Sequence, residues 1–143
     1  MAKKTSKQVE GYVYALLQSS DLASSLSGGV YRQGLRPRDS KLEDAVVIFT
    51  SGRAAEQIQT GVVTLNIYVP DIDPYANGVL VEDGSRVEEL QSLAQAWADS
   101  LTCSVTDGYR FRLAQTITSE EEADLGQHFV VVALDYEYYD GEE

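Results

Sequence analysis

Hydrophobic residues recur at helical spacing near the start of the chain. In residues 5–19 they fall on one face, and Thr5 with Gln8 has the form of a capping box that begins a helix. Asp21 is placed to cap a further short helical turn, which ends at the following glycine pair. We therefore expect one amphipathic helix followed by a short helical turn. The apolar face consists of Val9, Val13, Leu16 and Leu17.

A second stripe at helical spacing occurs in residues 85–102. Ser85 with Glu88 has the form of another capping box, and the apolar stripe behind it includes Trp97. A helix that lies on a sheet requires such an apolar face, so Trp97 is interpreted as a core residue. The other members of the stripe are Val87, Leu90, Leu93, Ala94 and Leu101.

Between and after the helices, apolar and polar residues alternate with the period of a half-buried strand. The alternation is strict in residues 63–69, where Val63, Leu65, Ile67 and Val69 point one way. Residues 50–61 are interpreted as a connection that is partly paired as a hairpin, and residues 120–127 as a polar loop. The last strand begins apolar on both faces, and its far end is expected to leave the core. Strands are predicted at 30–31, 45–49, 63–69, 109–118 and 128–139.

These elements follow the order α-β-β-β-α-β-β, which predicts an α+β fold. We expect a mainly antiparallel sheet with two helices packed on one face. The length of 143 residues fits one domain, 1–143, with a flexible acidic tail over 138–143. No apolar run approaches the roughly 18 residues of a membrane span, so we expect a cytosolic protein.

Charge is distributed unevenly along the chain, whose net charge is −12. Residues 1–41 contain 7 basic and 3 acidic residues, whereas the remainder contains 4 basic and 20 acidic ones. Such a chain is a poor candidate for binding nucleic acid by neutralising phosphates. A solvated acidic surface is the simpler interpretation. The alternative is that a basic region of one copy meets an acidic region of another.

The search for catalytic or metal-binding motifs is negative. His128 is the sole histidine and Cys103 the sole cysteine, and neither belongs to a triad or nucleophile-elbow pattern. Cys103 is interpreted as a small buried hydrophobe at the end of a helix. The acidic loop after residue 69 imitates the start of a calcium loop at Asp73, but Tyr75 and Gly84 occupy two ligand places. We expect no enzyme activity, cofactor or metal site.

Nearly the whole chain resembles the tail-completion or tail-terminator family of long-tailed bacteriophages. The resemblance follows the order of an N-terminal helix, a "GGVYRQG" turn and strand, and a basic loop with proline. The strands "EDAVVIF" and "GVVTLNIYV", the helix "SRVEELQSLAQAWADSL" and the final "HFVVVALDYEYY" follow. The loop "PDIDPYANGVLVEDGS" is longer than the family pattern, and the acidic tail also departs from it.

The resemblance implies a virion protein made in the host cytoplasm. Proteins of that family form rings, commonly of six copies, with twelve as the alternative here. They join the tail tube to the head connector and let DNA pass without specific binding or membrane contact. The hypothetical interface residues are Arg36, Arg38, Pro70, Asp71, Asp73 and Tyr75. Alternatives are a head-closure or other connector ring of a short-tailed phage, and a small ligand-binding or hydrolase α+β domain.

Overall fold

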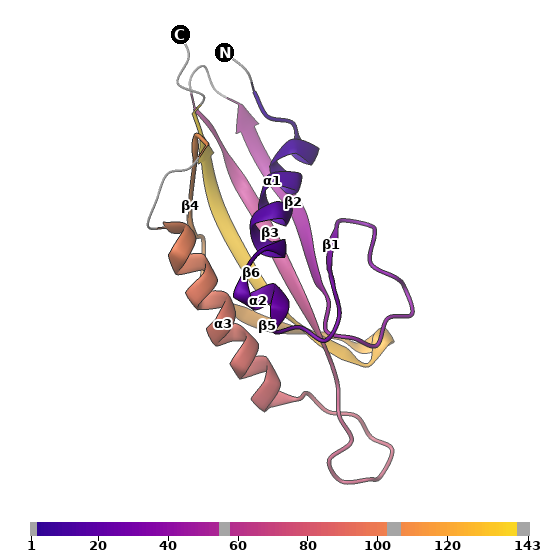
Figure 1. Ribbon diagram of the computed structural model, residues 1–143. Helices are drawn as coiled ribbons and strands as arrows, with labels where there is room; N and C mark the ends of the chain where they lie inside the picture. The colour runs from indigo at the N-terminus through magenta and orange to yellow at the C-terminus, as the bar shows by residue number, and fades with distance from the viewer. Residues whose placement is uncertain (1–2, 55–57, 103–106, 140–143) are drawn as a thin grey trace.

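The structure is a computed structural model that describes residues 3–54, 58–102 and 107–139. Figure 1 shows helices in front of a long, twisted sheet. The helices are α1 (Ser6–Gln18), α2 (Asp21–Ser24) and α3 (Gly84–Thr102), with a 3-10 turn η1 (Ala123–Leu125). The strands are β1 (Val30–Arg32), β2 (Ala45–Ala54), β3 (Gln59–Pro70), β4 (Tyr109–Leu113), β5 (Thr118–Glu122) and β6 (Gln127–Tyr138).

The sheet is built around its two longest strands, β3 and β6. The strand order is β1-β2-β3-β6-β4, and β5 pairs with β6 as well. Strand β1 is parallel to β2, and all other pairs are antiparallel. In the central pair, Val69 lies opposite His128 and Gln59 opposite Tyr138, so the two strands match over their full length.

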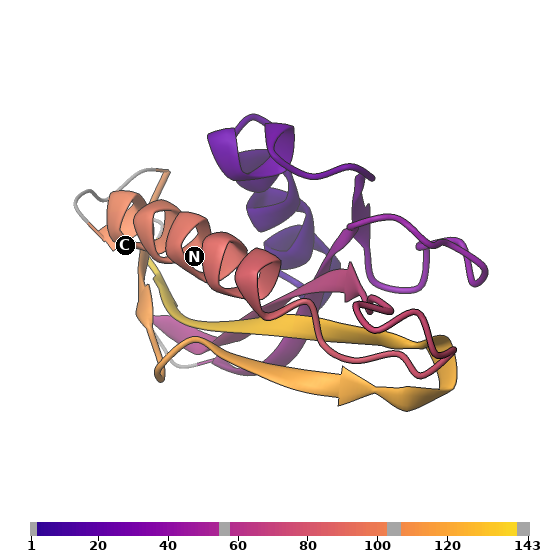
Figure 2. The same ribbon diagram turned by 90° about the horizontal axis from the view of Figure 1, so that it is seen from below.

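The helices cover one face of the sheet and leave the other open, as the view from below shows (Figure 2). The core lies between the two layers. It contains Val9, Val13 and Leu17 of α1, the β3 side chains predicted to point inward, and the α3 stripe with Trp97. This architecture confirms the predicted α+β class and the placement of the two main helices on one face.

Two of the three helix starts differ from the prediction. Helix α1 has the expected capping box of Thr5 and Gln8. The side chain of Ser20, not Asp21, caps α2. For α3, the Asp83 side chain accepts a hydrogen bond from the Arg86 backbone, so the cap lies two residues before Ser85. Ser and Asp are both good N-cap residues. In α2 and α3 the cap is the candidate that comes earlier in the sequence, Ser20 and Asp83.

The second half of the sheet contains a strand that the sequence pattern missed. The predicted strand 109–118 ends at Leu113 as β4, and a separate strand, β5, begins only at Thr118; both pair with β6. The predicted polar loop is therefore mostly strand β5 and the turn η1. Three consecutive glutamates hid β5 because an exposed edge strand needs no apolar face.

The end of the last strand stays in the core, contrary to the prediction. Tyr136 and Tyr138 are buried, and Tyr109 and Tyr12 stack 4.1 Å apart beside them. The expected flexible tail at 138–143 thus begins within an ordered strand, and its residues 140–143 lie outside the described part of the chain. The prediction for Cys103 also falls outside the described residues.

Candidate interaction surface

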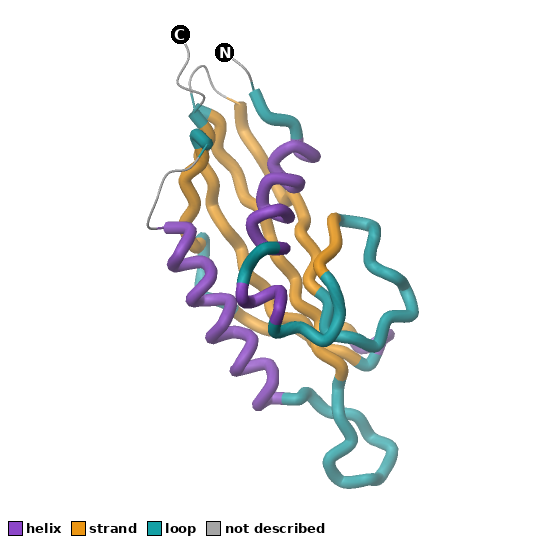
Figure 3. The backbone as a smooth tube through the Cα atoms, in the orientation of Figure 1, coloured by secondary structure: helices purple, strands orange, loops and turns teal. Residues whose placement is uncertain are grey.

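Two long connections project from the sheet, one beside its β1 edge and the other beyond its lower end (Figure 3). The first joins β1 to β2, and we name its residues 33–44 the basic loop. The second joins β3 to α3, and we name its residues 71–83 the arm. The hypothetical interface residues all lie in these two segments, except Pro70, which ends β3 directly before the arm.

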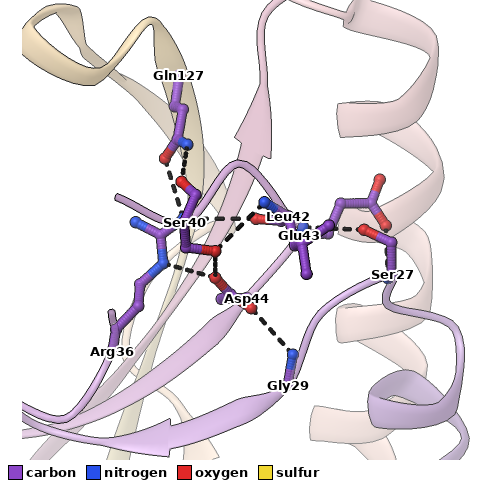
Figure 4. A network of polar contacts seen from close by, with 8 residues as sticks. All are labelled: Ser27, Gly29, Arg36, Ser40, Leu42, Glu43, Asp44 and Gln127. Atoms are coloured by element: carbon purple, nitrogen blue, oxygen red, sulfur yellow. Dashed lines mark hydrogen bonds and ion pairs between the residues drawn. The ribbon is translucent and has the colours of Figure 1, made fainter. Parts of the chain in front are cut away.

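The basic loop is anchored by Asp44, whose side chain is buried. One carboxylate oxygen accepts a hydrogen bond from the Gly29 backbone at 2.9 Å. The other accepts one from Arg36 Nε at 2.9 Å and one from the Ser40 hydroxyl (Figure 4). A Cβ atom at Gly28 would lie only 2.0 Å from Asp44 Oδ1, so this approach requires glycine.

Arg36 connects the basic loop to strands β6 and β3. Its guanidinium donates to Gln127 Oε1 at 3.1 Å and lies 4.1 Å from the centre of the Tyr68 ring. Gln127 in turn donates to the Ser40 carbonyl at 2.9 Å. Only 10% of the Arg36 side chain is exposed. Arg36 is therefore engaged within its own chain, and its pairing with an acidic residue of a neighbouring copy stays a hypothesis.

Three buried or half-buried carboxylates, those of Asp44, Glu43 and Glu10, have a lowered pKa. For Asp44, burial alone would raise the pKa, but hydrogen bonds from Ser40, Gly29 and Arg36 outweigh it. For Glu43, the paired Arg86 guanidinium is the largest cause of the lowering. Glu10 is also held as an anion, because hydrogen bonds and charge outweigh its burial. These are fixed anions rather than groups poised to transfer a proton.

The arm begins at a second internal contact. Pro70 lies opposite Gln127, and the Asp71 backbone donates to the Gly126 carbonyl at 3.0 Å. The Asp71 carboxylate forms a 2.7 Å hydrogen bond with His128 Nδ1, and only 8% of its side chain is exposed. Asp71 is therefore engaged within its own chain and is a poor partner for a neighbour.

Asp73 organises the tip of the arm. Its two carboxylate oxygens accept hydrogen bonds from the backbones of Asn77 and Gly78, at 3.1 and 2.9 Å. Farther back, Ile72 and Val81 form a two-bonded antiparallel bridge. Within the described residues no group of three or more His, Cys, Asp or Glu side chains could hold a metal ion. Asp73 therefore acts as a cap for the backbone of the arm tip.

The arm carries five of the ten large hydrophobic side chains that are exposed in the described part of the chain. The Tyr75 side chain is 76% exposed. It lies in the turn that the hydrogen bonds to Asp73 hold. Leu125 of η1 is exposed beside the arm, where Leu80 approaches Gly126. Several exposed apolar side chains on one short segment mark it as a candidate interaction site. The exposed apolar arm residues are Ile72, Tyr75, Val79, Leu80 and Val81.

The basic loop presents apolar and charged groups together. Leu35 and Leu42 are exposed, and so are Arg38 and Lys41. The acidic Asp39 is exposed between the two cations. Arg38 is thus accessible to a partner, whereas Arg36 is nearly buried. Sequence reasoning missed the leucines, because single apolar residues in a loop carry no periodic signal.

Other depressions of the surface are shallow and mixed in chemistry. One of about 330 Å³ lies on the open face of the sheet, where Arg110 and Arg112 lie beside Asp135 and Glu137. Another, of about 410 Å³, lies between α2 and α3, with Leu22 and Trp97 among its lining residues. Asp44 and Glu10, whose pKa values are lowered, line neither depression.

Comparison with known proteins supports the fold but supplies no function. No protein-family model matches the chain, and no curated protein matches it. One solved structure is similar with a TM-score of 0.50 and 17% sequence identity, covering 95% of this chain and 98% of the other. At this identity the likeness concerns the fold alone. No helix of the described residues is long and apolar enough to cross a membrane.

Proposed function

We propose that the protein is a structural component of a bacteriophage neck or tail, a member of the tail-completion or tail-terminator family. In this role it forms a ring that terminates the tail tube or joins it to the head connector. The observation that carries the proposal is the arm, a preorganised segment with an exposed apolar surface. Such a segment suits assembly with other proteins, because its conformation needs no further ordering on binding.

The polar clusters of the described chain support this non-enzymatic role. Asp44, Glu10 and Glu43 hold loops and helices together through arginine pairs. His128 positions the base of the arm through Asp71. We therefore expect His128→Gln and Cys103→Ser to leave particle assembly intact. Loss of assembly in a folded Cys103→Ser protein, or in a His128→Gln protein whose arm keeps its conformation, would contradict a purely structural role.

A ring of this acidic chain lets DNA pass without binding it. The net charge of −12 per copy gives each ring a strong negative field. A channel wall that repels phosphates gains no free energy from counterion release, so DNA slides past it. Contacts between copies must then be apolar or charge-complementary. The arm and the basic loop meet this requirement, because both carry exposed apolar residues and the basic loop carries two exposed cations.

The proposal is tested by deleting the coding sequence from the genome that carries it and examining the particles by electron microscopy. We expect heads without joined tails, or tails of abnormal length, and restoration by a plasmid copy. Mass spectrometry of purified virions should detect the protein. Normal particles after deletion would overturn the proposal. Tails of normal length that fail to join, together with a contact with the head connector, would favour the connector-ring alternative.

A further inference from the structure

We propose that the arm of one copy docks on the basic loop of another copy, head to tail. The docking partner is a second copy of this chain. The proposal rests on the proposed ring-forming function and names the surfaces that make the ring. It replaces the pairing of Arg36 with Asp71 and Asp73 that the sequence suggested, since these side chains are engaged within one chain.

The arm offers an apolar surface with an acidic border. Tyr75, Val79 and Leu80 are exposed at its centre. Strand β5, which contacts the arm, carries the exposed acids Glu120 and Glu121. The two segments are joined by a hydrogen bond from the Ser119 hydroxyl to Glu82 at 3.2 Å. An apolar centre with a charged border is the usual anatomy of a protein interface.

The basic loop offers a surface that is complementary to the arm in both polarity and charge. Leu35 and Leu42 supply apolar contacts, and Arg38 and Lys41 supply positive charge. The buried Asp44 holds the loop in shape. Apolar groups therefore meet apolar groups, and cations meet the acids bordering the arm. This pairing also lets copies of a strongly acidic chain approach each other.

The two surfaces lie at different places on the molecule, so the contact is heterologous. The basic loop extends beyond the β1 edge of the sheet, whereas the arm extends beyond its end (Figure 1). When each copy uses its arm on the next copy's loop, both surfaces of every copy are occupied. A heterologous contact closes into a ring if the rotation between copies allows it.

The test cross-links two variants that each carry one introduced cysteine, in a Cys103→Ser background. One variant carries Asp39→Cys in the basic loop, and the other carries Ala76→Cys at the arm tip. Both positions are exposed, and neither side chain has a role in the contacts that hold its loop. The variants are mixed at high protein concentration and treated with a short bismaleimide. We expect at least fivefold more heterodimer than in a mixture of Asp39→Cys with Ala15→Cys, an exposed position on α1.

Charge reversal supplies the specific control. Arg38→Glu with Lys41→Glu in the loop variant should reduce the heterodimer to the level of the Ala15→Cys mixture. Glu120→Lys with Glu121→Lys in the arm variant should then restore it. Circular dichroism checks that each variant is folded. Arg36→Glu is avoided, because it would place a carboxylate against the buried Asp44.

Three results would overturn the proposal. One is a heterodimer yield no higher than that of the Ala15→Cys mixture. Another is an equal yield from Ala76→Cys alone, which would indicate a symmetric contact between arms. The third is a yield that charge reversal does not change. Failure of the proposed function is a separate outcome: a cross-linked contact together with normal particles after gene deletion would keep the docking and discard the phage role.

Discussion

The basic loop and the arm are both exposed connections of the sheet, but they are held in different ways. The basic loop depends on buried side-chain contacts to distant parts of the chain, among them Gly29 and Gln127. The arm is held mainly by hydrogen bonds within itself, between Asp73 and its own backbone. Two surfaces that look alike from outside should therefore respond differently to mutation.

The difference has a physical origin in burial. A charge removed from water must be compensated by a partner, and losing that partner leaves an uncompensated buried charge. Asp44 and Arg36 are such a pair. An exposed turn instead depends on local backbone geometry, so its disruption costs less and spreads less. The following predictions separate these two cases.

The largest effect is expected at Asp44. Asp44→Ala should lower the free energy of unfolding by about 3–5 kcal/mol, because Arg36 then stays nearly buried without its counter-charge. Urea denaturation followed by circular dichroism measures the change. Asp39→Ala, which removes an exposed acid from the same loop, should stay within about 0.5 kcal/mol of the parent. Equal effects of the two substitutions would show that the loop is not anchored by burial.

Acid pH should weaken the anchored region. The pKa values of Asp44, Glu43 and Glu10 are lowered in the folded protein. The unfolded chain therefore binds protons first, and stability present above about pH 4 is lost as the pH falls through the folded pKa values. Urea midpoints measured from pH 7 down to pH 3 should fall, with a shallower fall in Asp44→Asn. Identical pH profiles for parent and variant would refute the contribution of Asp44.

A smaller effect is expected in the arm at Gly78. Its φ of 80° suits glycine, so Gly78→Ala should cost roughly 1–2 kcal/mol although no neighbour lies within 4 Å. Gly84→Ala is the matched control, because that site is equally open and has no positive φ. Hydrogen exchange should become faster in the arm while the exchange of β3 amides is unchanged. Faster exchange throughout the sheet would show that the arm is coupled to the core.

Sequence periodicity predicted the parts of the fold where burial follows a regular pattern. The strand of Val63 to Val69 and the stripe of Trp97 repeat at the spacing of their elements, so their inward faces were found correctly. Strand β5 was missed because its position depends on pairing with β6, and no apolar residue marks its glutamates.

The candidate site was predicted only in outline. The two loops were identified by composition, but charge alone does not show whether a residue is free. Arg36 and Arg38 are two positions apart and chemically identical, yet the first is paired with Asp44 and the second is exposed. Which arginine turns inward depends on the position of Gln127 and Tyr68, which the fold brings from distant strands.

The smallest effect on stability is expected at Tyr75. Tyr75→Ala should change the free energy of unfolding by no more than about 0.5 kcal/mol, since the side chain is 76% exposed and no described contact depends on it. Trp97→Ala, which empties a core position, should cost about 3–5 kcal/mol and serves as the comparison. Chemical denaturation measures both. A loss above 1 kcal/mol at Tyr75 would mean that its ring supports the fold, and the arm would then be a structural element rather than a surface free to dock.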